Sequence, residues 1–280
     1  MCSWRKVLVP VSGEQASSCA GPLSGAFTLA KRFGAQVEGV YLAETLEVPA
    51  GDDFPAGASH AQGGTATLER PAVGNADRAL AAFSIYSRQF PEVQAALTGL
   101  DGELGLSLAR HARLADVTVV GNAGRYQTEF WQAAREAALF ESGRPVLVVP
   151  TGEIIESAGE TLLIAWKDDA AAARALATAL PLIAKARYIC VMAIGEESKV
   201  GASLRAAHRH LRLHNPDVYI ELVEAGDRLA GELLLAKADL WDDVILLMGA
   251  YGHSRLRERV TGGVTEYILQ HTTVPVLMAH

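Results

Sequence analysis

The sequence predicts an α/β protein made of two tandem, doubly wound domains, each with a mainly parallel sheet flanked by helices. Three observations support this prediction. The 280 residues run twice through the same order of strand-like and helix-like segments. The strand-like segments are short, continuous apolar runs, which are typical of parallel strands buried on both faces. The composition, half hydrophobic and poor in aromatic residues, suits helices packed on such strands.

Each half opens with an aliphatic and β-branched segment, at 6–11 in the first half and at 161–166 in the second. We expect these segments to be the first strands, each followed by a helix. Further strands are expected at 36–43, 93–98, 116–120 and 144–149, and again at 188–194, 218–223, 243–248 and 274–278. Apolar residues at helical spacing are expected to face the core from the helices, and these are Leu80, Phe83, Phe90, Leu104, Leu108, Ala112, Ala172, Leu176, Leu180, Ile183, Leu204, Leu211, Leu229, Leu233, Ala236 and Leu240.

Turn-forming residues divide the two halves. The stretch 150–160 is polar and contains Pro150, Gly152 and Gly159, so we place a first domain at 1–152 and a second at 159–280. Another segment has no counterpart in the second half, because 47–64 is rich in Gly, Pro, Ala and Asp. Its composition predicts a surface loop.

Charge and cysteine content narrow the classes of function. The formal net charge of −7 argues against nucleic acid as a partner. Cys2, Cys19 and Cys190 are too few and too scattered for a disulfide framework or a cysteine-rich zinc site. No apolar run approaches the ~20 residues of a membrane span, and no apolar signal region follows the N-terminus. We therefore expect a protein of the reducing cytoplasm that does not bind membranes.

The strongest functional signal is a glycine-rich segment after the fourth strand of the second half. Residues 249–252 read Gly-Ala-Tyr-Gly, and after nine further residues 262–265 read Gly-Gly-Val-Thr, where a helix is expected to start. Ligands of open α/β sheets bind beyond the carboxyl ends of the strands. Glycine lets the backbone approach a phosphate closely, and free N–H groups at a helix start attract anions. The segment therefore predicts a phosphate site, to which Thr265 adds a hydroxyl donor and His253 or Arg255 adds positive charge.

In this segment the chain resembles the universal stress protein family in its tandem two-domain form, which carries Gly-x-x-Gly, nine residues, and then Gly with Ser or Thr. Gly263 stands where that family usually has Ser or Thr. The resemblance is strong in the second half, weaker in the first, and includes the Val-Pro-Val-type last strand. It implies five-stranded sheets of strand order 3-2-1-4-5. It also implies that the final strands, 146–149 and 276–278, meet either within one chain or between the chains of a homodimer.

The resemblance further implies a regulatory or protective protein that binds ATP, with or without magnesium, or a related phosphate-bearing small molecule. In ATP-binding members, an acidic residue at the end of the first strand contacts the nucleoside, and a second-strand residue contacts adenine through its backbone. The matching positions here are Lys167 and Ala193. The candidate binding residues are therefore Lys167, Ala193, Met248, Gly249, Gly252, His253, Gly262, Gly263, Val264 and Thr265.

Lys167 departs from the family pattern, because an ammonium group offers only hydrogen-bond donors and cannot accept from ribose hydroxyls. It would instead attract a phosphate or another anion. Two interpretations of Asp168 and Asp169 stay open, either as the missing acidic group or as the N-cap of the following helix.

The first half departs further from the pattern, and we expect it not to bind nucleotide. Ser12 replaces the acidic residue, and no second glycine pair follows Gly121 and Gly124. Bulky side chains in the segment 125–134 would fill the space that a phosphate needs.

No catalytic residue or metal ligand is predicted. His208, His210 and His214 are expected on one helix, where neighbouring arginines favour a solvated basic face over a metal site. Trp166 and Trp241 are expected in the core or at an interface.

Two alternatives to a binding protein remain open. A slow ATPase or adenylyl-transfer enzyme would need an acidic group near the glycine loop, for which Asp168 and Glu266 are the candidates. An interaction scaffold without a ligand is the other alternative.

Overall fold

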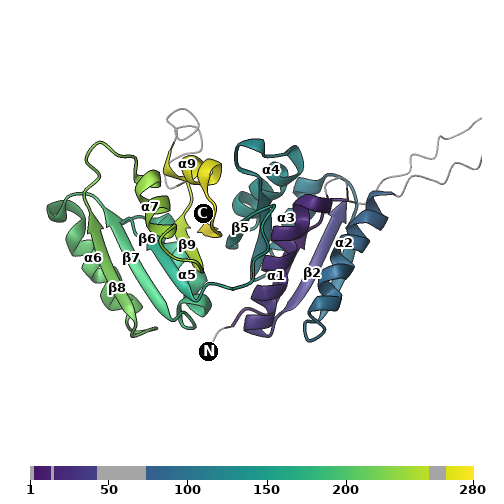
Figure 1. Ribbon diagram of the computed structural model, residues 1–280, viewed down its shortest axis with the longest axis horizontal. Coiled ribbons are helices and arrows are strands. Elements are labelled where there is room, and N and C mark those ends of the chain that lie inside the picture. The colour runs from purple at the N-terminus through teal and green to yellow at the C-terminus, as the bar shows by residue number, and fades with distance from the viewer. Residues whose placement is uncertain (1–2, 14–15, 43–73, 252–262) are drawn as a thin grey trace, which may run out of the picture.

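The computed structural model describes residues 3–13, 16–42, 74–251 and 263–280, in which strands and helices alternate along the chain (Figure 1). The surface loop expected at 47–64 lies outside these described residues. So do Cys2 and three candidate binding residues, Gly252, His253 and Gly262.

The first half contains five strands and four α-helices within the described ranges. In chain order these are β1 (Lys6–Pro10), α1 (Ala20–Phe33), β2 (Gln36–Leu42), α2 (Asn75–Gln89), β3 (Ala95–Leu100), α3 (Leu104–Ala112), β4 (Val117–Asn122), α4 (Glu129–Glu136) and β5 (Val146–Pro150). A π-helical turn, Ala137–Glu141, extends α4.

The second half repeats this order. Its described elements are β6 (Thr161–Ala165), α5 (Ala170–Ile183), β7 (Tyr188–Ile194), α6 (Glu197–Leu211), β8 (Val218–Val223), α7 (Ala230–Ala238), β9 (Val244–Gly249), α9 (Val264–His271) and β10 (Val276–Ala279). The repeat expected from the sequence is therefore present in the fold.

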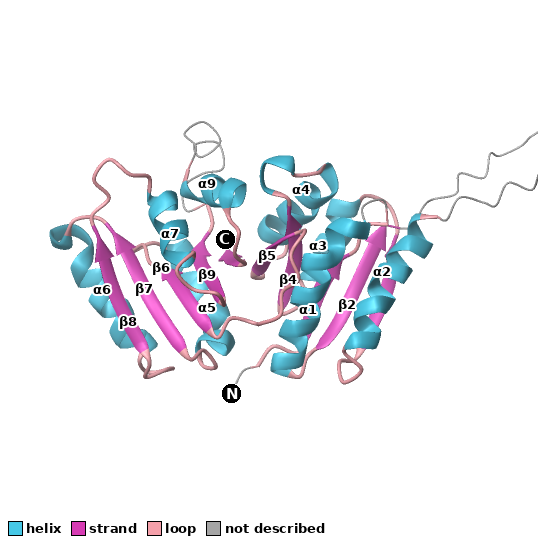
Figure 2. Cartoon of the chain, in the orientation of Figure 1, coloured by secondary structure: helices cyan, strands magenta, loops and turns pink. Residues whose placement is uncertain are grey.

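The strands form one ten-stranded sheet in the order β3-β2-β1-β4-β5-β10-β9-β6-β7-β8 (Figure 2). Each half contributes five parallel strands with the order 3-2-1-4-5, which confirms the predicted fold class. The halves join where β5 and β10 pair antiparallel, with Val148 opposite Val276 and Val146 opposite Met278. The final strands thus meet within one chain, the intramolecular of the two arrangements expected.

The central strands are continuous apolar runs because helices cover both faces of the sheet. All residues of β4 are buried, and Leu162, Leu163 and Ile164 of β6 are almost without solvent exposure. This burial is the main favourable contribution to folding. None of the helices in the described ranges is long and apolar enough to cross a membrane.

Three details differ from the predictions. The third strand is Ala95–Leu100 rather than 93–98. Leu80, Leu229 and Leu240 are 53%, 60% and 70% exposed, and Ala236 is exposed as well. Leu229 precedes α7 and Leu240 follows it, so neither lies on the buried side of that helix, which instead buries Leu233, Leu234, Leu235 and Ala238. His214 lies beyond the end of α6.

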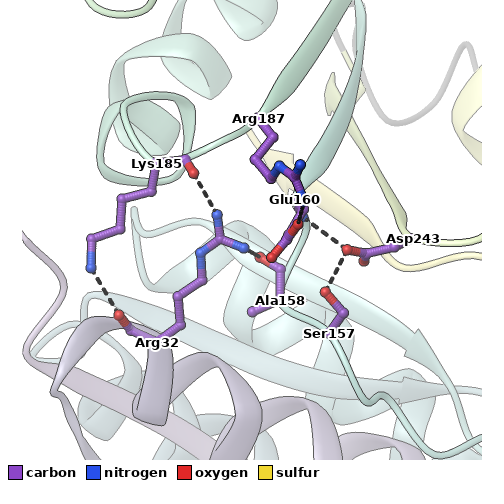
Figure 3. Close-up of polar contacts among 7 residues, drawn as sticks. All are labelled: Arg32, Ser157, Ala158, Glu160, Lys185, Arg187 and Asp243. Atoms are coloured by element: carbon purple, nitrogen blue, oxygen red, sulfur yellow. Dashed lines mark hydrogen bonds and ion pairs between the residues drawn. The ribbon is translucent and has the colours of Figure 1, made fainter.

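A reciprocal contact between α1 and the segment after α5 fixes the halves to each other (Figure 3). The Arg32 guanidinium donates to the Lys185 carbonyl at 2.7 Å and to the Ala158 carbonyl at 3.2 Å. The Lys185 ammonium donates in return to the Arg32 carbonyl at 2.8 Å. Cations at helix C-termini satisfy carbonyls that have no partner within the helix.

Asp243, which precedes β9, holds the C-terminal end of the linker between β5 and β6, on either side of Ala158 (Figure 3). Its carboxylate accepts from the Ser157 hydroxyl and, at 3.1 Å, from the Glu160 backbone N–H. Arg187 pairs with the Glu160 carboxylate at 3.2 Å. The linker between β5 and β6 is therefore bonded to both halves.

Candidate functional site

A pocket of about 390 Å³ lies in the second half, at the carboxyl ends of β6, β7 and β9. This is the position where open α/β sheets bind ligands, since loops there leave a crevice between strands and helices. The volume falls within the range of small-molecule sites.

One side of the pocket is formed by backbone that comes unusually close. A Cβ atom at Gly249 would lie 2.5 Å from backbone atoms of Ala171 and Ala172, so only glycine fits where β9 ends beside the start of α5. Gly249 lines the pocket, together with Gly263, Val264 and Thr265 at the start of α9.

The N-terminus of α9 faces this pocket. Its N-cap is Gly263, which has no side chain to satisfy the free N–H groups of the first turn. Thr265 is buried, and its hydroxyl oxygen accepts from the Tyr251 backbone N–H at 3.4 Å. Free N–H groups and the positive end of the helix dipole favour an anion at such a position.

The pocket is also lined by residues that follow β6. Lys167 pairs with Asp169 at 3.3 Å, and the Asp169 carboxylate also accepts from the Ala172 N–H at 2.9 Å. Asp169 is therefore the N-cap of α5, one of its two open interpretations. Asp168 is exposed and lines the pocket. Lys199 of α6 also lies at the pocket and pairs with Glu196.

The walls of the pocket are mostly apolar. Six such residues, from β7, α6, α7 and β9 and the segment after β9, are Met192, Ile194, Val200, Leu234, Met248 and Tyr251. Trp166 lines the pocket too, and its indole N–H donates to the Ser203 hydroxyl at 2.9 Å. The site thus combines apolar walls with glycine backbone, a helix start and charged groups.

The structure brings six of the predicted binding residues to this pocket: Lys167, Met248, Gly249, Gly263, Val264 and Thr265. Ala193 is buried and does not line it, because strand side chains alternate and its neighbours Met192 and Ile194 face the pocket. The predicted backbone contact from β7 stays a prediction. Gly252, His253 and Gly262 lie outside the described residues.

Sequence reasoning missed the contributions of α6 and α7. Lys199, Val200 and Ser203 lie on one face of α6, and Ala230 and Leu234 lie on one face of α7. Their spacing is also that of an ordinary helix packed on a sheet, so no signal in the sequence separates them from core residues.

In the first half, the described residues at the corresponding strand ends are closely packed. A Cβ at Gly121 would lie 2.8 Å from the ring of Trp131, which is fully buried and donates to the Ser18 hydroxyl at 2.9 Å. Near the end of β1, a Cβ at Gly13 would lie 2.0 Å from the Asn75 carbonyl oxygen. That the first half does not bind nucleotide stays a prediction.

No group of three His, Cys, Asp or Glu side chains in the described parts of the chain is placed to hold a metal. Burial raises the pKa of the Cys19 thiol and of the Cys190 thiol to about 11, so neither is a ready nucleophile. Trp241 is partly buried and packs against Tyr188 and Lys237.

Comparisons with known proteins point to one family. Residues 191–280 match the model described as the universal stress protein family. Universal stress protein Slr1230 of Synechocystis is 44% identical over 64 residues, a match that covers 20% of this chain and 22% of that protein. The matched part of the chain therefore spans about a fifth of that relative's length.

Solved structures extend the likeness to both halves. A universal stress protein from Archaeoglobus fulgidus has 14% identity and a TM-score of 0.63, covering 98% of this chain and 95% of its own. A putative universal stress protein from Pseudomonas aeruginosa has 15% identity and a TM-score of 0.56, covering 99% and 93%. At such identities the likeness establishes a common fold.

Proposed function

We propose that this chain is a regulatory or protective protein that binds ATP or a related phosphate-bearing ligand in the second-half pocket, because residues 191–280 match the model of the universal stress protein family. The observation that carries the proposal is a pocket lined both by Gly249, where backbone segments come unusually close, and by the start of α9, whose N-cap Gly263 has no side chain.

Each side of the pocket suits one part of such a ligand. The phosphates belong at Gly249, Gly263 and the first turn of α9, where backbone N–H groups and the helix dipole stabilise negative charge. The apolar walls, among them Met192 and Leu234, suit a flat base. A magnesium ion would enter with the triphosphate, since Mg²⁺ is commonly held by substrate phosphates and few carboxylates.

The charged side of the pocket favours hydrogen bonding through Asp168. Lys167 is already paired with Asp169, and Asp169 caps α5, so these two groups largely satisfy each other. The Asp168 carboxylate is an acceptor and lies one residue from the position where ATP-binding relatives carry their acidic residue. We therefore assign contact with the sugar hydroxyls to Asp168.

A pair of substitutions on α7 tests the proposal. Ala230 lines the pocket, and a tryptophan at this position would fill the space in which we propose that the ligand binds. Ala236 is exposed on the same helix, so Ala236→Trp is the matched control. We expect calorimetric titration with ATP and magnesium to detect binding in the wild-type protein and in Ala236→Trp, but none in Ala230→Trp.

The same variants, expressed in cells, distinguish a ligand-binding protein from an interaction scaffold without a ligand. If ligand binding matters, Ala230→Trp reproduces the phenotype of a deletion, whereas Ala236→Trp does not. The absence of heat with millimolar ATP in the wild-type protein would refute the proposal. We also propose that the protein resides in the reducing cytoplasm, because its cysteines are too few and too scattered for a disulfide framework.

A further inference from the structure

The helix that opens onto the pocket is held at its other end by the first half. The Asn122 side-chain amide, buried at the end of β4, donates to the Leu269 carbonyl at 2.8 Å. Arg125 donates to Nε2 of His271 at 2.7 Å, while Nδ1 of His271 donates to the Tyr267 carbonyl at 2.8 Å. The last turn of α9 is therefore bonded to a segment more than a hundred residues away.

The segment that makes these bonds is the first-half counterpart of the glycine loop. Residues 121–124 begin within the last two residues of β4, and residues 249–252 begin at the last residue of β9, with glycine at both ends of each segment. Gly124 has a φ of +58°, and a Cβ there would lie 3.2 Å from the Gln270 carbonyl oxygen. The conformation and the close approach both favour glycine at this contact with α9.

A second contact runs in the opposite direction, from the loop after β9 to the first half. The Tyr251 ring lies 5.1 Å from the Phe140 ring, which the π-helical turn after α4 presents to it. Tyr251 lines the pocket and has a φ of +51°, a conformation that is uncommon for a bulky residue and persists only when its surroundings enforce it. Its backbone N–H also points to the Thr265 hydroxyl.

We propose that Asn122, Arg125 and Phe140 are positioning residues for the second-half pocket, so that the first half sets the affinity of a ligand it does not touch. Asn122 and Arg125 fix the direction of α9, and with it the N–H groups of its first turn. Phe140 fixes Tyr251. The identity of the ligand in this inference rests on the proposed function.

The physical reason is the shortness of α9. It has eight residues, and a helix of that length has little stability of its own in water. Its first turn can bind an anion tightly only if it is already held in place, since ordering on binding lowers affinity. The first half supplies part of that restraint through Asn122 and Arg125, in addition to the packing of α9 on α7 within the second half.

The test combines two substitutions in the full chain, Arg125→Ala and Phe140→Ala, and uses two measurements. Amide hydrogen exchange of residues 263–271 is followed without ligand, and ATP affinity is measured by calorimetry. We expect faster exchange confined to this segment and binding about fivefold weaker. The control is Tyr126→Ala, in the same loop, because Tyr126 is 88% exposed. It should leave both quantities unchanged.

A variant with Phe140→Leu in place of Phe140→Ala keeps an apolar side chain in contact with Tyr251, so it should recover most of the lost ATP affinity. The same variant replaces the double alanine variant in both measurements if that variant fails to fold. Local faster exchange supports the inference even if the wild-type protein binds no ATP, in which case only the proposed function fails. Unchanged exchange at 263–271 in a folded variant overturns the inference, as does faster exchange with unchanged ATP affinity.

Discussion

At the scale of single residues, Trp131 and the start of α9 explain why the two halves differ. In the first half the ring of Trp131 packs directly against Gly121, whereas in the second half Gly249 packs against the start of α5 and lines a pocket. The sequence indicated this difference, because glycine spacing and bulky residues can be read directly. It did not indicate Ser203 or Leu234, because the face that a helix presents to a pocket depends on how the helix docks.

Removing the Trp131 ring tests its structural role. Trp131→Ala leaves a cavity at a fully buried position and loses the hydrogen bond to Ser18, so we expect the free energy of unfolding to fall by about 3–5 kcal/mol. Chemical denaturation measures this loss. Tyr126→Ala, at an exposed position nearby in sequence, should change stability little. A loss below about 1 kcal/mol for Trp131→Ala would mean that the ring is not packed as described.

Glu38 makes stability depend on pH. Burial alone would raise the pKa of this carboxyl group, but hydrogen bonds and positive charge from Lys6 and His111 outweigh burial and lower the pKa. A carboxyl whose pKa is lowered by folding stabilises the protein above its unfolded pKa of about 4.3, and the contribution is lost as pH falls through the folded value.

We therefore expect Glu38→Gln to be less stable than the wild-type protein at pH 7, and the difference to shrink in acid below about pH 4. Thermal unfolding across this pH range measures it. Glu141→Gln, at an exposed position, should run parallel to the wild-type curve throughout. A difference that grows on acidification would contradict the assigned role of Lys6 and His111.

At the scale of elements, the strands were more predictable than the residues that the helices bury. Buried parallel strands are continuous apolar runs, which can be identified directly in the sequence. The edge strand β3 is largely exposed, so its pattern is weak and its predicted position was two residues off. Leu229 and Leu240 are apolar yet exposed beside α7, because an apolar residue need not lie inside.

The linker is an element whose order depends on Asp243. Asp243→Ala removes the acceptor for the Glu160 N–H and the Ser157 hydroxyl, so we expect a loss of about 1–3 kcal/mol in stability and faster proteolysis within 151–160. Limited proteolysis followed by mass spectrometry locates the cleavage. Asp242→Ala, at the exposed neighbouring position, is the control. Equal cleavage rates in the two variants would contradict the assigned role of Asp243.

At the scale of the whole molecule, the antiparallel pair of β5 and β10 turns two repeats into one continuous sheet. Each final strand covers the other's edge, so neither presents unpaired backbone groups at the junction. The sequence left open whether these strands pair within one chain or between chains, because the same apolar pattern suits both. The arrangement also places residues 122–125 against α9. This contact joins segments that are far apart in the sequence, so it cannot be predicted from a local sequence pattern.

We propose a single ligand site within the described parts of the chain, at the pocket lined by Gly249 and the start of α9. Calorimetric titration of the full chain with ATP in magnesium buffer tests it most directly. We predict a stoichiometry of one ATP per chain, lost in Ala230→Trp and kept in Ala236→Trp. Two ATP molecules per chain, no binding, or binding that survives Ala230→Trp would contradict the account.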